Sequence, residues 1–388
     1  MGGTRVRQVA CRLAGVVLLV FAAGCGGASG APEPGARAGW RTWAAGFTGP
    51  APSGTCLPTE RLLLCPVAPA GFVAHSASTG EAVWSVGADR AKGRNAGAAA
   101  DGDRAVSAGG RTLRAVDLTA GRVAWTKVLP AGRTFGPPAT ADGVVYAATY
   151  GATAAEPQTL FAYRASDGTP LWQRDTTETA PFARGGRVLT VESGARAVAR
   201  DGRTGEVVAT SDPAHPCPSL IAAPGYLVCT ESGSAAGDTF PPVVRVDPAT
   251  LRFVRTLWRP GDKPYGGVIS PDGVLVLRTV NAEDASSGGW TALDLRTGKT
   301  LWTTTGPEDG GTNDDVVLAG SRAVWISGGR LVSVDPRTGP YATGVGAPRR
   351  SRVYAEASDG RSPRLTAYGT HLVLQPGTRP ALRSVTAP

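Results

Sequence analysis

A pattern of eleven residues recurs along the chain and constrains the fold more than any other feature. Two copies agree closely, Ala115–Trp125 and Ala292–Trp302, and both fit A-x-D-x-x-x-G-[KR]-x-x-W. Weaker copies keep part of the pattern, and its glycine position falls at 39, 80, 121, 168, 205, 251, 298 and 339, with leucine at 251. Successive positions are 37 to 47 residues apart. A repeat of about 40 residues, built from short strands and turns, predicts the blades of a β-propeller.

Short apolar or alternating runs bounded by Gly, Asp or Pro accompany the repeats, such as Val144–Thr149, Val274–Thr279 and Leu331–Asp335. Runs of this kind are typical of strands, and no long stretch has the 3.6-residue period of a helix. The sequence therefore predicts an all-β fold, an eight-bladed β-propeller of four-stranded antiparallel blades.

Each part of the motif has a physical role in a strand–turn–strand unit. The aspartate ends the third strand, and its carboxylate can accept hydrogen bonds from backbone N–H groups two residues later. The glycine takes the positive φ of the turn, and the tryptophan lies in the outer strand against the neighbouring blade. We expect these structural roles for Trp43, Trp84, Trp125, Trp172, Trp302, Gly80, Gly121, Gly168, Gly298, Asp117 and Asp294.

The two ends of the chain are expected to close the ring together. After the last repeat come three strand-like segments, at 351–356, at 365–368 with 372–374, and at 381–385, and no outer strand. The isolated segment Gly39–Ala45 resembles an outer strand without the other three. We therefore expect the N-terminal strand to complete the C-terminal blade, which would leave no open sheet edge.

The repeat resembles the tryptophan-docking motif of the PQQ-type quinoprotein β-propellers, over about residues 39–388. The resemblance implies the fold, but the family includes quinone-dependent dehydrogenases, BamB-like outer-membrane assembly lipoproteins and repeat proteins without a cofactor. Family members of the methanol-dehydrogenase type carry adjacent half-cystines, a calcium site and a catalytic aspartate in longer chains. This sequence has no Cys-Cys pair, and only the blade motif can be matched to the family. We therefore expect no cofactor and no enzymatic activity.

The N-terminal segment is typical of an exported lipoprotein. Arg5, Arg7 and Arg12 precede an uncharged apolar run at 13–23, which is too short to span a bilayer. Small residues then lead into Cys25, a pattern that resembles the bacterial lipobox. We expect a signal peptide at 1–24, lipidation of Cys25, a flexible tether at 25–38 and the propeller at 39–388. The alternative is an ordinary signal peptide in which Cys25 is incidental.

Four further cysteines, Cys56, Cys65, Cys217 and Cys229, are expected to form disulfides. The spacings are 9 and 12 residues, and each pair spans the first two strands of one predicted blade. Pairing between the two sets would join the first complete blade to the fifth, on opposite sides of the ring. An even number of cysteines in an exported chain favours Cys56–Cys65 and Cys217–Cys229, and four free buried thiols are the alternative.

Other charged groups give weaker signals. The acidic segment Glu308–Asp315 suits either a cation site or a solvated loop, and Arg349, Arg350 and Arg352 suit either an anion or pairing with that loop. The three histidines form no zinc motif. The formal net charge is +9, but no run of Lys and Arg is long enough to favour a nucleic acid partner.

Taken together, these features predict a monomeric, non-enzymatic binding or scaffold module, anchored to the cell membrane by lipid on its extracellular or periplasmic side. The expected partner is a protein, a peptide or a cell-wall polymer. The alternatives are a BamB-like factor for envelope protein assembly and a PQQ-dependent dehydrogenase.

Overall fold

The computed structural model describes residues 42–47, 52–87, 96–151, 153, 158–176, 180–192, 196–230, 240, 242–258, 262–280, 288–304, 316–327, 330–341, 348–353, 364–375 and 381–386. The chain divides into two compact units, Met1–Glu33 and Pro34–Pro388, and every described residue lies in the second unit. No described residue is helical, so none forms a helix that could cross a membrane.

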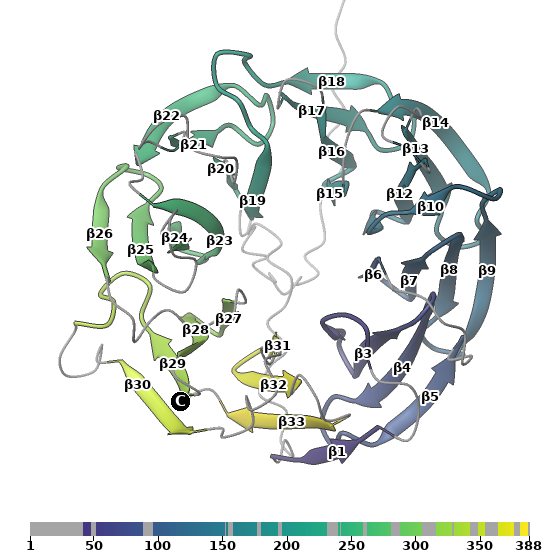
Figure 1. The fold of residues 1–388 in the computed structure, drawn as a ribbon, viewed down its shortest axis with the longest axis horizontal. Helices are drawn as coiled ribbons and strands as arrows, with labels where there is room; N and C mark the ends of the chain where they lie inside the picture. The colour runs from purple at the N-terminus through teal and green to yellow at the C-terminus, as the bar shows by residue number, and fades with distance from the viewer. Residues whose placement is uncertain are drawn as a thin grey trace, which may run out of the picture. The chain divides into compact units, whose positions relative to one another are not determined.

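The strands of the second unit form eight antiparallel sheets, here called blades 1 to 8 in chain order (Figure 1). Blade 1 comprises β2 (Leu57–Pro58), β3 (Leu62–Val67), β4 (Gly71–Ser76) and β5 (Ala82–Val86), and blade 2 comprises β6 (Gly97–Asp101), β7 (Arg104–Gly109), β8 (Thr112–Asp117) and β9 (Arg122–Val128). Blade 3 comprises β10 (Thr134–Phe135), β11 (Ala139–Ala141), β12 (Val144–Tyr150), β13 (Gln158–Arg164) and β14 (Pro170–Thr176). Blade 4 comprises β15 (Phe182–Arg184), β16 (Arg187–Glu192), β17 (Arg196–Asp201) and β18 (Val207–Thr210). In blade 3 the short strands β10 and β11 both pair with β12 and together take the innermost position.

Blade 5 comprises β19 (Ser219–Ala223), β20 (Tyr226–Thr230), β21 (Val243–Val246) and β22 (Phe253–Trp258), and blade 6 comprises β23 (Lys263–Ile269), β24 (Val274–Val280), β25 (Gly288–Asp294) and β26 (Thr300–Thr303). Blade 7 comprises β27 (Val317–Ala319), β28 (Arg322–Ser327), β29 (Arg330–Val334) and β30 (Arg349–Val353). Blade 8 comprises β31 (Arg364–Tyr368), β32 (His371–Gln375), β33 (Ala381–Thr386) and β1 (Ala44–Gly46). Within each blade the chain runs from the innermost strand outward, except that β1 is the outer strand of blade 8.

Blade 8 is built from both ends of the chain. β1 pairs antiparallel with β33, with Ala44 opposite Arg383 and Gly46 opposite Ala381. The innermost strands of blades 8 and 1, β31 and β2, also contact each other. The hydroxyl of Tyr368 donates a hydrogen bond to the backbone carbonyl of Glu60 across the same boundary.

The structure corrects the sequence-based assignment of the last strands. The segment at 351–356 was expected to be an inner strand of the last blade, but β30 (Arg349–Val353) pairs with β29 as the outer strand of blade 7. The stretch at 365–374 is two strands, β31 and β32, instead of one. The reason is an insertion, because the outer strand begins one or two residues after the motif glycine at Gly121 or Gly298 but ten residues after Gly339.

The apolar core is divided among the boundaries between blades. The described residues form eight hydrophobic clusters, and each combines side chains from two neighbouring blades. Because successive side chains of a strand point to opposite faces, a strand between two neighbours buries both faces. This explains why every residue of β24 is buried and why the strand begins with an apolar run from Val274 to Leu277. We call each boundary a junction and name it by its two blades.

Candidate binding surface

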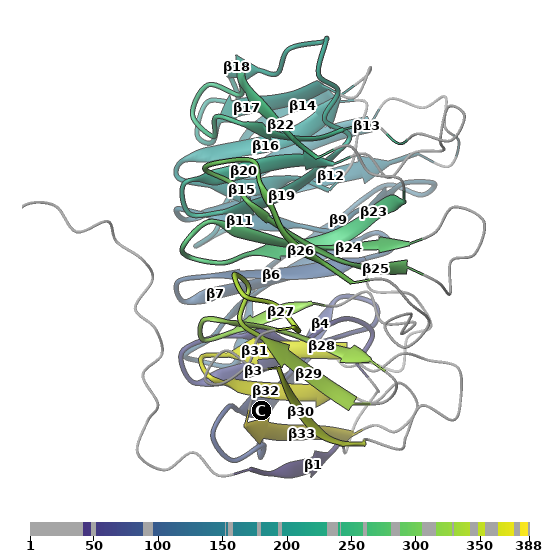
Figure 2. The ribbon, with the colours of Figure 1, turned by 90° about the vertical axis from the view of Figure 1, so that its left-hand side faces the viewer.

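One face of the propeller is formed by tight turns. They connect the first strand of a blade to the second and the third to the fourth, as at 102–103 and 118–121 in blade 2, and Figure 2 views the blades from the side. We call this the tight-turn face. Its geometry is set by the repeat motif, whose aspartate and glycine lie in the second kind of turn.

The motif aspartates hold these turns through backbone N–H groups. Asp117 Oδ1 accepts hydrogen bonds from the N–H groups of Thr119 and Ala120, at 2.9 and 2.8 Å. These bonds, the one from Ala120 foremost, favour the charged carboxylate, so the pKa of Asp117 lies below its ordinary value. Gly121 completes the turn with a φ of 60°, which residues with a Cβ atom rarely adopt.

Asp294 has the same role in blade 6 and an additional partner. Its Oδ1 accepts from the N–H groups of Arg296 and Thr297, both at 2.9 Å. Its Oδ2 accepts a 2.9 Å bond from Arg337 of blade 7. Burial opposes the charged form, but the Arg337 guanidinium and the turn N–H groups outweigh it, and the pKa of Asp294 is lowered to about 2.

Each motif tryptophan lies against the turn of the next blade. Trp43, Trp84, Trp125, Trp172 and Trp302 pack on Gly80, Gly121, Gly168, Gly205 and Gly339, respectively. A Cβ atom on Gly168 would lie 2.8 Å from the Trp125 ring, so this close packing requires glycine. Trp125 and Trp302 are only 8% and 7% exposed, as expected for side chains enclosed within a junction.

Four of these five indoles also donate a hydrogen bond across the junction. Each N–H group reaches the backbone carbonyl of the residue after the motif aspartate position, from Trp43 to Ala77, Trp125 to Ala165, Trp172 to Gly202 and Trp302 to Pro336, at 2.8–3.1 Å. The equivalent acceptor for Trp84 is the carbonyl of Leu118. Trp84 makes no hydrogen bond with any described residue, and its side chain is only partly buried.

Among the junctions whose motif positions are described, two lack the tryptophan–glycine pair. At junction 4/5 the tryptophan position holds Ala209 and the glycine position holds Leu251, which is fully buried in the same cluster as Ala209. Leu251 adopts a φ of 55°, so the turn keeps its shape without glycine. At junction 5/6 Gly298 faces Arg255 instead, and a Cβ atom on Gly298 would lie 3.5 Å from the Arg255 Cδ atom.

Both expected disulfides are present. Cys56 is joined to Cys65 and Cys217 to Cys229, with Cα separations of 4.1 and 4.8 Å. Cys56 directly precedes β2 and lies opposite Cys65, but Cys217 lies two residues before β19, so the residue paired with Cys229 is Leu220. The first disulfide lies in the cluster at junction 8/1 and the second in that at junction 4/5.

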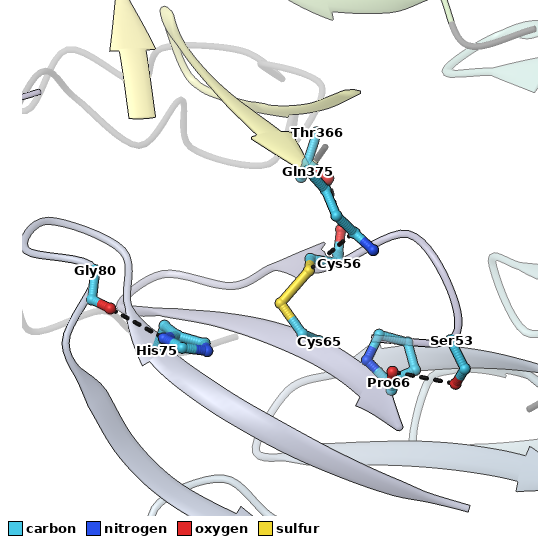
Figure 3. Close-up of a disulfide and its surroundings, with 8 residues drawn as sticks. All are labelled: Ser53, Cys56, Cys65, Pro66, His75, Gly80, Thr366 and Gln375. Carbon is cyan, nitrogen blue, oxygen red and sulfur yellow. Dashed lines mark hydrogen bonds between the residues drawn. A yellow bond between two sulfur atoms is a disulfide. The ribbon is translucent and has the colours of Figure 1, made fainter. Parts of the chain in front are cut away.

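Figure 3 shows how the first disulfide adjoins blade 8. The Thr366 hydroxyl donates a 2.9 Å hydrogen bond to the backbone carbonyl of Cys56. The Cys56 sulfur lies 3.4 Å from Gln375 Oε1, a contact rather than a hydrogen bond because a disulfide sulfur carries no hydrogen. The disulfide therefore lies where the first complete blade meets the blade that contains both chain ends.

A pocket of about 860 Å³ opens at junction 1/2. It is lined by Pro58, Thr59, Glu60, Arg61, Leu62, Val83, Trp84, Ala100, Asp101, Gly102, Asp103, Leu118 and Thr119. These residues come from the turn between β2 and β3, the outer strand β5 and two turns of blade 2. Sequence reasoning did not find this pocket, because the four segments are far apart in the repeat pattern.

Other sequence-based candidates lie partly outside the described residues. Cys25, the segments 1–24 and 25–38, and the acidic segment Glu308–Asp315 all lie there. The side chains of Arg350 and Arg352 are likewise not described, and Arg349 is exposed. Among the described residues, no group of His, Cys, Asp and Glu side chains is placed to hold a metal ion.

Comparisons with known proteins agree with this architecture. Residues 70–216 match the family model described as outer membrane protein assembly factor BamB. No curated protein matches the chain. The structure of BamB from Moraxella catarrhalis is 15% identical with a TM-score of 0.58, covering 88% of this chain and 98% of that one.

Two further solved structures share the fold at low identity. The computationally designed protein Ika8 is 13% identical with a TM-score of 0.63, covering 88% of this chain and 98% of that one. The quinohemoprotein alcohol dehydrogenase ADHIIG from Pseudomonas putida HK5 is 13% identical with a TM-score of 0.61, covering 89% and 76%. The chain is therefore an eight-bladed β-propeller, and its residues 70–216 resemble BamB-like, PQQ-type repeats.

Proposed function

We propose that this protein is an exported, lipid-anchored propeller that binds a partner outside the cytoplasmic membrane and catalyses no reaction. The pocket at junction 1/2 is the main support for a binding role, because it combines an aromatic side chain with acidic side chains. The signal-like segment before Cys25 supports export and anchoring.

Lipidation can be tested by metabolic labelling with an alkyne fatty acid. The wild-type protein is expected to carry the label and to sediment with membranes. Cys25→Ser should lose the label and either appear in the medium or remain uncleaved, whereas Cys11→Ser, inside the signal segment, should behave like the wild type. Normal membrane retention of Cys25→Ser would contradict the anchor.

The absence of catalysis can be tested by soaking the purified protein with PQQ and Ca²⁺. The proposal predicts no stoichiometric quinone absorbance and no dye-linked oxidation of alcohols. Stoichiometric PQQ together with alcohol oxidation would replace the binding proposal with the dehydrogenase, whose fold the chain shares.

A BamB-like role in envelope assembly is the second candidate, and the family match over residues 70–216 favours it. It makes a separate prediction, since deletion of the gene should lower the amounts of several outer-membrane proteins at once. Unchanged levels in a host that has an outer membrane would exclude this role.

A further inference from the structure

The pocket at junction 1/2 exists where one docking tryptophan differs from the others. Trp125 is 8% exposed and donates its N–H group to Ala165 at 2.8 Å, which seals junction 2/3. Trp84 packs on Gly121 in the same way, but its N–H group has no partner among the described residues. Val83, beside it in β5, is 54% exposed. Junction 1/2 is thus open at its outer part and offers an unused indole donor.

Acidic side chains dominate the polar lining. Glu60, Asp101 and Asp103 line the pocket together with a single cation, Arg61. The Glu60 carboxylate makes no hydrogen bond or ion pair with a described residue. The pocket therefore has a formal charge of about −2 from its own side chains.

Asp101 and Asp103 each use one carboxylate oxygen, Oδ2, in an interaction with the protein. Asp101 Oδ2 accepts a 3.0 Å bond from the N–H group of Gly143 in blade 3. Asp103 Oδ2 pairs with Arg104 at 2.7 Å, and the Asp103 side chain is 68% exposed. The Oδ1 atom of each aspartate makes no hydrogen bond with a described residue, so both can accept one from a ligand.

We propose that this pocket binds an arginine side chain of a partner polypeptide, a site that would give the proposed binding function its ligand class. A guanidinium group is attracted both to an indole ring and to carboxylates, and it can donate to two carboxylate oxygens at once. The Trp84 N–H group, which no described residue accepts, can donate a hydrogen bond to the peptide carbonyl next to the bound arginine. The pocket volume of about 860 Å³ accommodates the side chain together with flanking backbone.

Fluorescence anisotropy with labelled five-residue peptides tests this inference. The probes are GRGRG, GEGEG and GQGQG, titrated with the folded full-length protein at about 50 mM salt, where exposed charges are weakly screened. GRGRG is expected to bind, and the acidic and neutral peptides are expected to bind at least tenfold more weakly. The affinity for GRGRG should fall as salt is raised.

Matched variants localise the binding. Glu60→Gln combined with Asp103→Asn should weaken GRGRG at least tenfold, whereas Asp142→Asn, in the corresponding turn of blade 3 and outside the pocket, should change it less than twofold. Trp84→Phe should weaken binding severalfold because the ring remains but the N–H donor is lost. Trp125→Phe, at a sealed junction, should leave binding unchanged.

Several outcomes would overturn the inference. It fails if GRGRG does not bind, if the Glu60→Gln/Asp103→Asn protein binds it as well as the wild type, or if the neutral sugar chitohexaose binds in its place with the same dependence on Trp84. Binding that persists in the pocket variants would remove this site but keep the protein a binding module. The proposed function itself would be contradicted by a different measurement, the PQQ-dependent oxidation of alcohols described above.

Discussion

Junctions 2/3 and 4/5 each pack an outer strand against the turn of the next blade, but the large and the small residue exchange places between them. At junction 2/3 a large side chain, Trp125, packs on a turn that has no side chain, Gly168. At junction 4/5 the outer strand has the small Ala209 and the turn has the large Leu251. The gap between blades is filled in both cases, so the constraint lies on the summed volume of the pair.

The second arrangement has two further features. Leu251 keeps a positive φ that a glycine would adopt more readily, which costs about 1–2 kcal/mol. Junction 4/5 also contains the Cys217–Cys229 disulfide, whereas no cysteine lies in the cluster at junction 2/3 among the described residues. The bridge joins Cys217 to Cys229 within blade 5, so it restrains one side of the junction and forms no covalent link between the two blades.

The largest effect is expected from removing a docking tryptophan that is buried within its junction. Trp125→Ala should lower the free energy of unfolding by about 3–5 kcal/mol, because a cavity replaces a buried ring. Val123→Ala, in the same strand but 43% exposed, should change it by less than about 0.5 kcal/mol. Urea denaturation followed by circular dichroism measures both. A loss below about 1 kcal/mol for Trp125→Ala would mean that the ring does not join the blades.

Next in size is the removal of the disulfide at the other kind of junction. Cys217→Ala with Cys229→Ala should lower the free energy of unfolding by about 2–3 kcal/mol, since the bridge restricts a short loop of the unfolded chain. The same denaturation experiment detects it. If the double variant is as stable as the wild type, the disulfide does not contribute to the stability of this side of junction 4/5.

An intermediate effect is expected at junction 6/7, where an ion pair adds to the docking tryptophan. Asp294→Asn should cost about 1–2 kcal/mol at pH 7, because Arg337 and the turn N–H groups lose a charged acceptor. The folded-state pKa of about 2 lies below the ordinary 3.8, so this stabilisation is complete above about pH 4 and is lost as the pH falls through 2.

A pH series of denaturation curves tests the ion pair at Asp294. The stabilities of the wild type and Asp294→Asn should converge near pH 2, and Asp175→Asn, an exposed change in β14, should follow the wild type at every pH. A gap between the two proteins that stays constant down to pH 2 would contradict the assigned role of the charge.

The smallest effect separates the open junction from the sealed ones. Trp125→Phe loses the hydrogen bond to the Ala165 carbonyl, whereas Trp84→Phe loses none, so the first should be more destabilising by about 1 kcal/mol. Thermal unfolding of the two variants side by side measures this difference. Equal losses would indicate that Trp84 is also bonded across its junction in solution.

Sequence reasoning predicted those parts of the molecule that depend on local spacing. The turn at Asp117 and Gly121 and the pairing of Cys56 with Cys65 follow from distances of a few residues within one blade. The position of β30 did not, because the insertion after Gly339 separates that strand from its motif.

The candidate site could not be predicted from the sequence in the same way. The pocket depends on the open state of Trp84 and on Glu60 and Asp103, which come from turns of two different blades. Trp84 and Trp125 hold the same motif position, and the repeat pattern does not indicate which of the two junctions is open. In the sequence, Ala209 in the tryptophan position and Leu251 in the glycine position resemble a degenerate repeat. Only the packing of the two residues in one cluster shows that the large and small residues have exchanged places.

A double-mutant cycle between Trp125 and Gly168 tests the volume rule most directly. Gly168→Leu alone should be strongly destabilising, because its side chain would overlap the Trp125 ring. In the Trp125→Ala protein the same change imitates Ala209 and Leu251 and should cost at least about 1–2 kcal/mol less. Additive losses, within about 0.5 kcal/mol, would contradict the claim that neighbouring blades are joined by filling one shared volume.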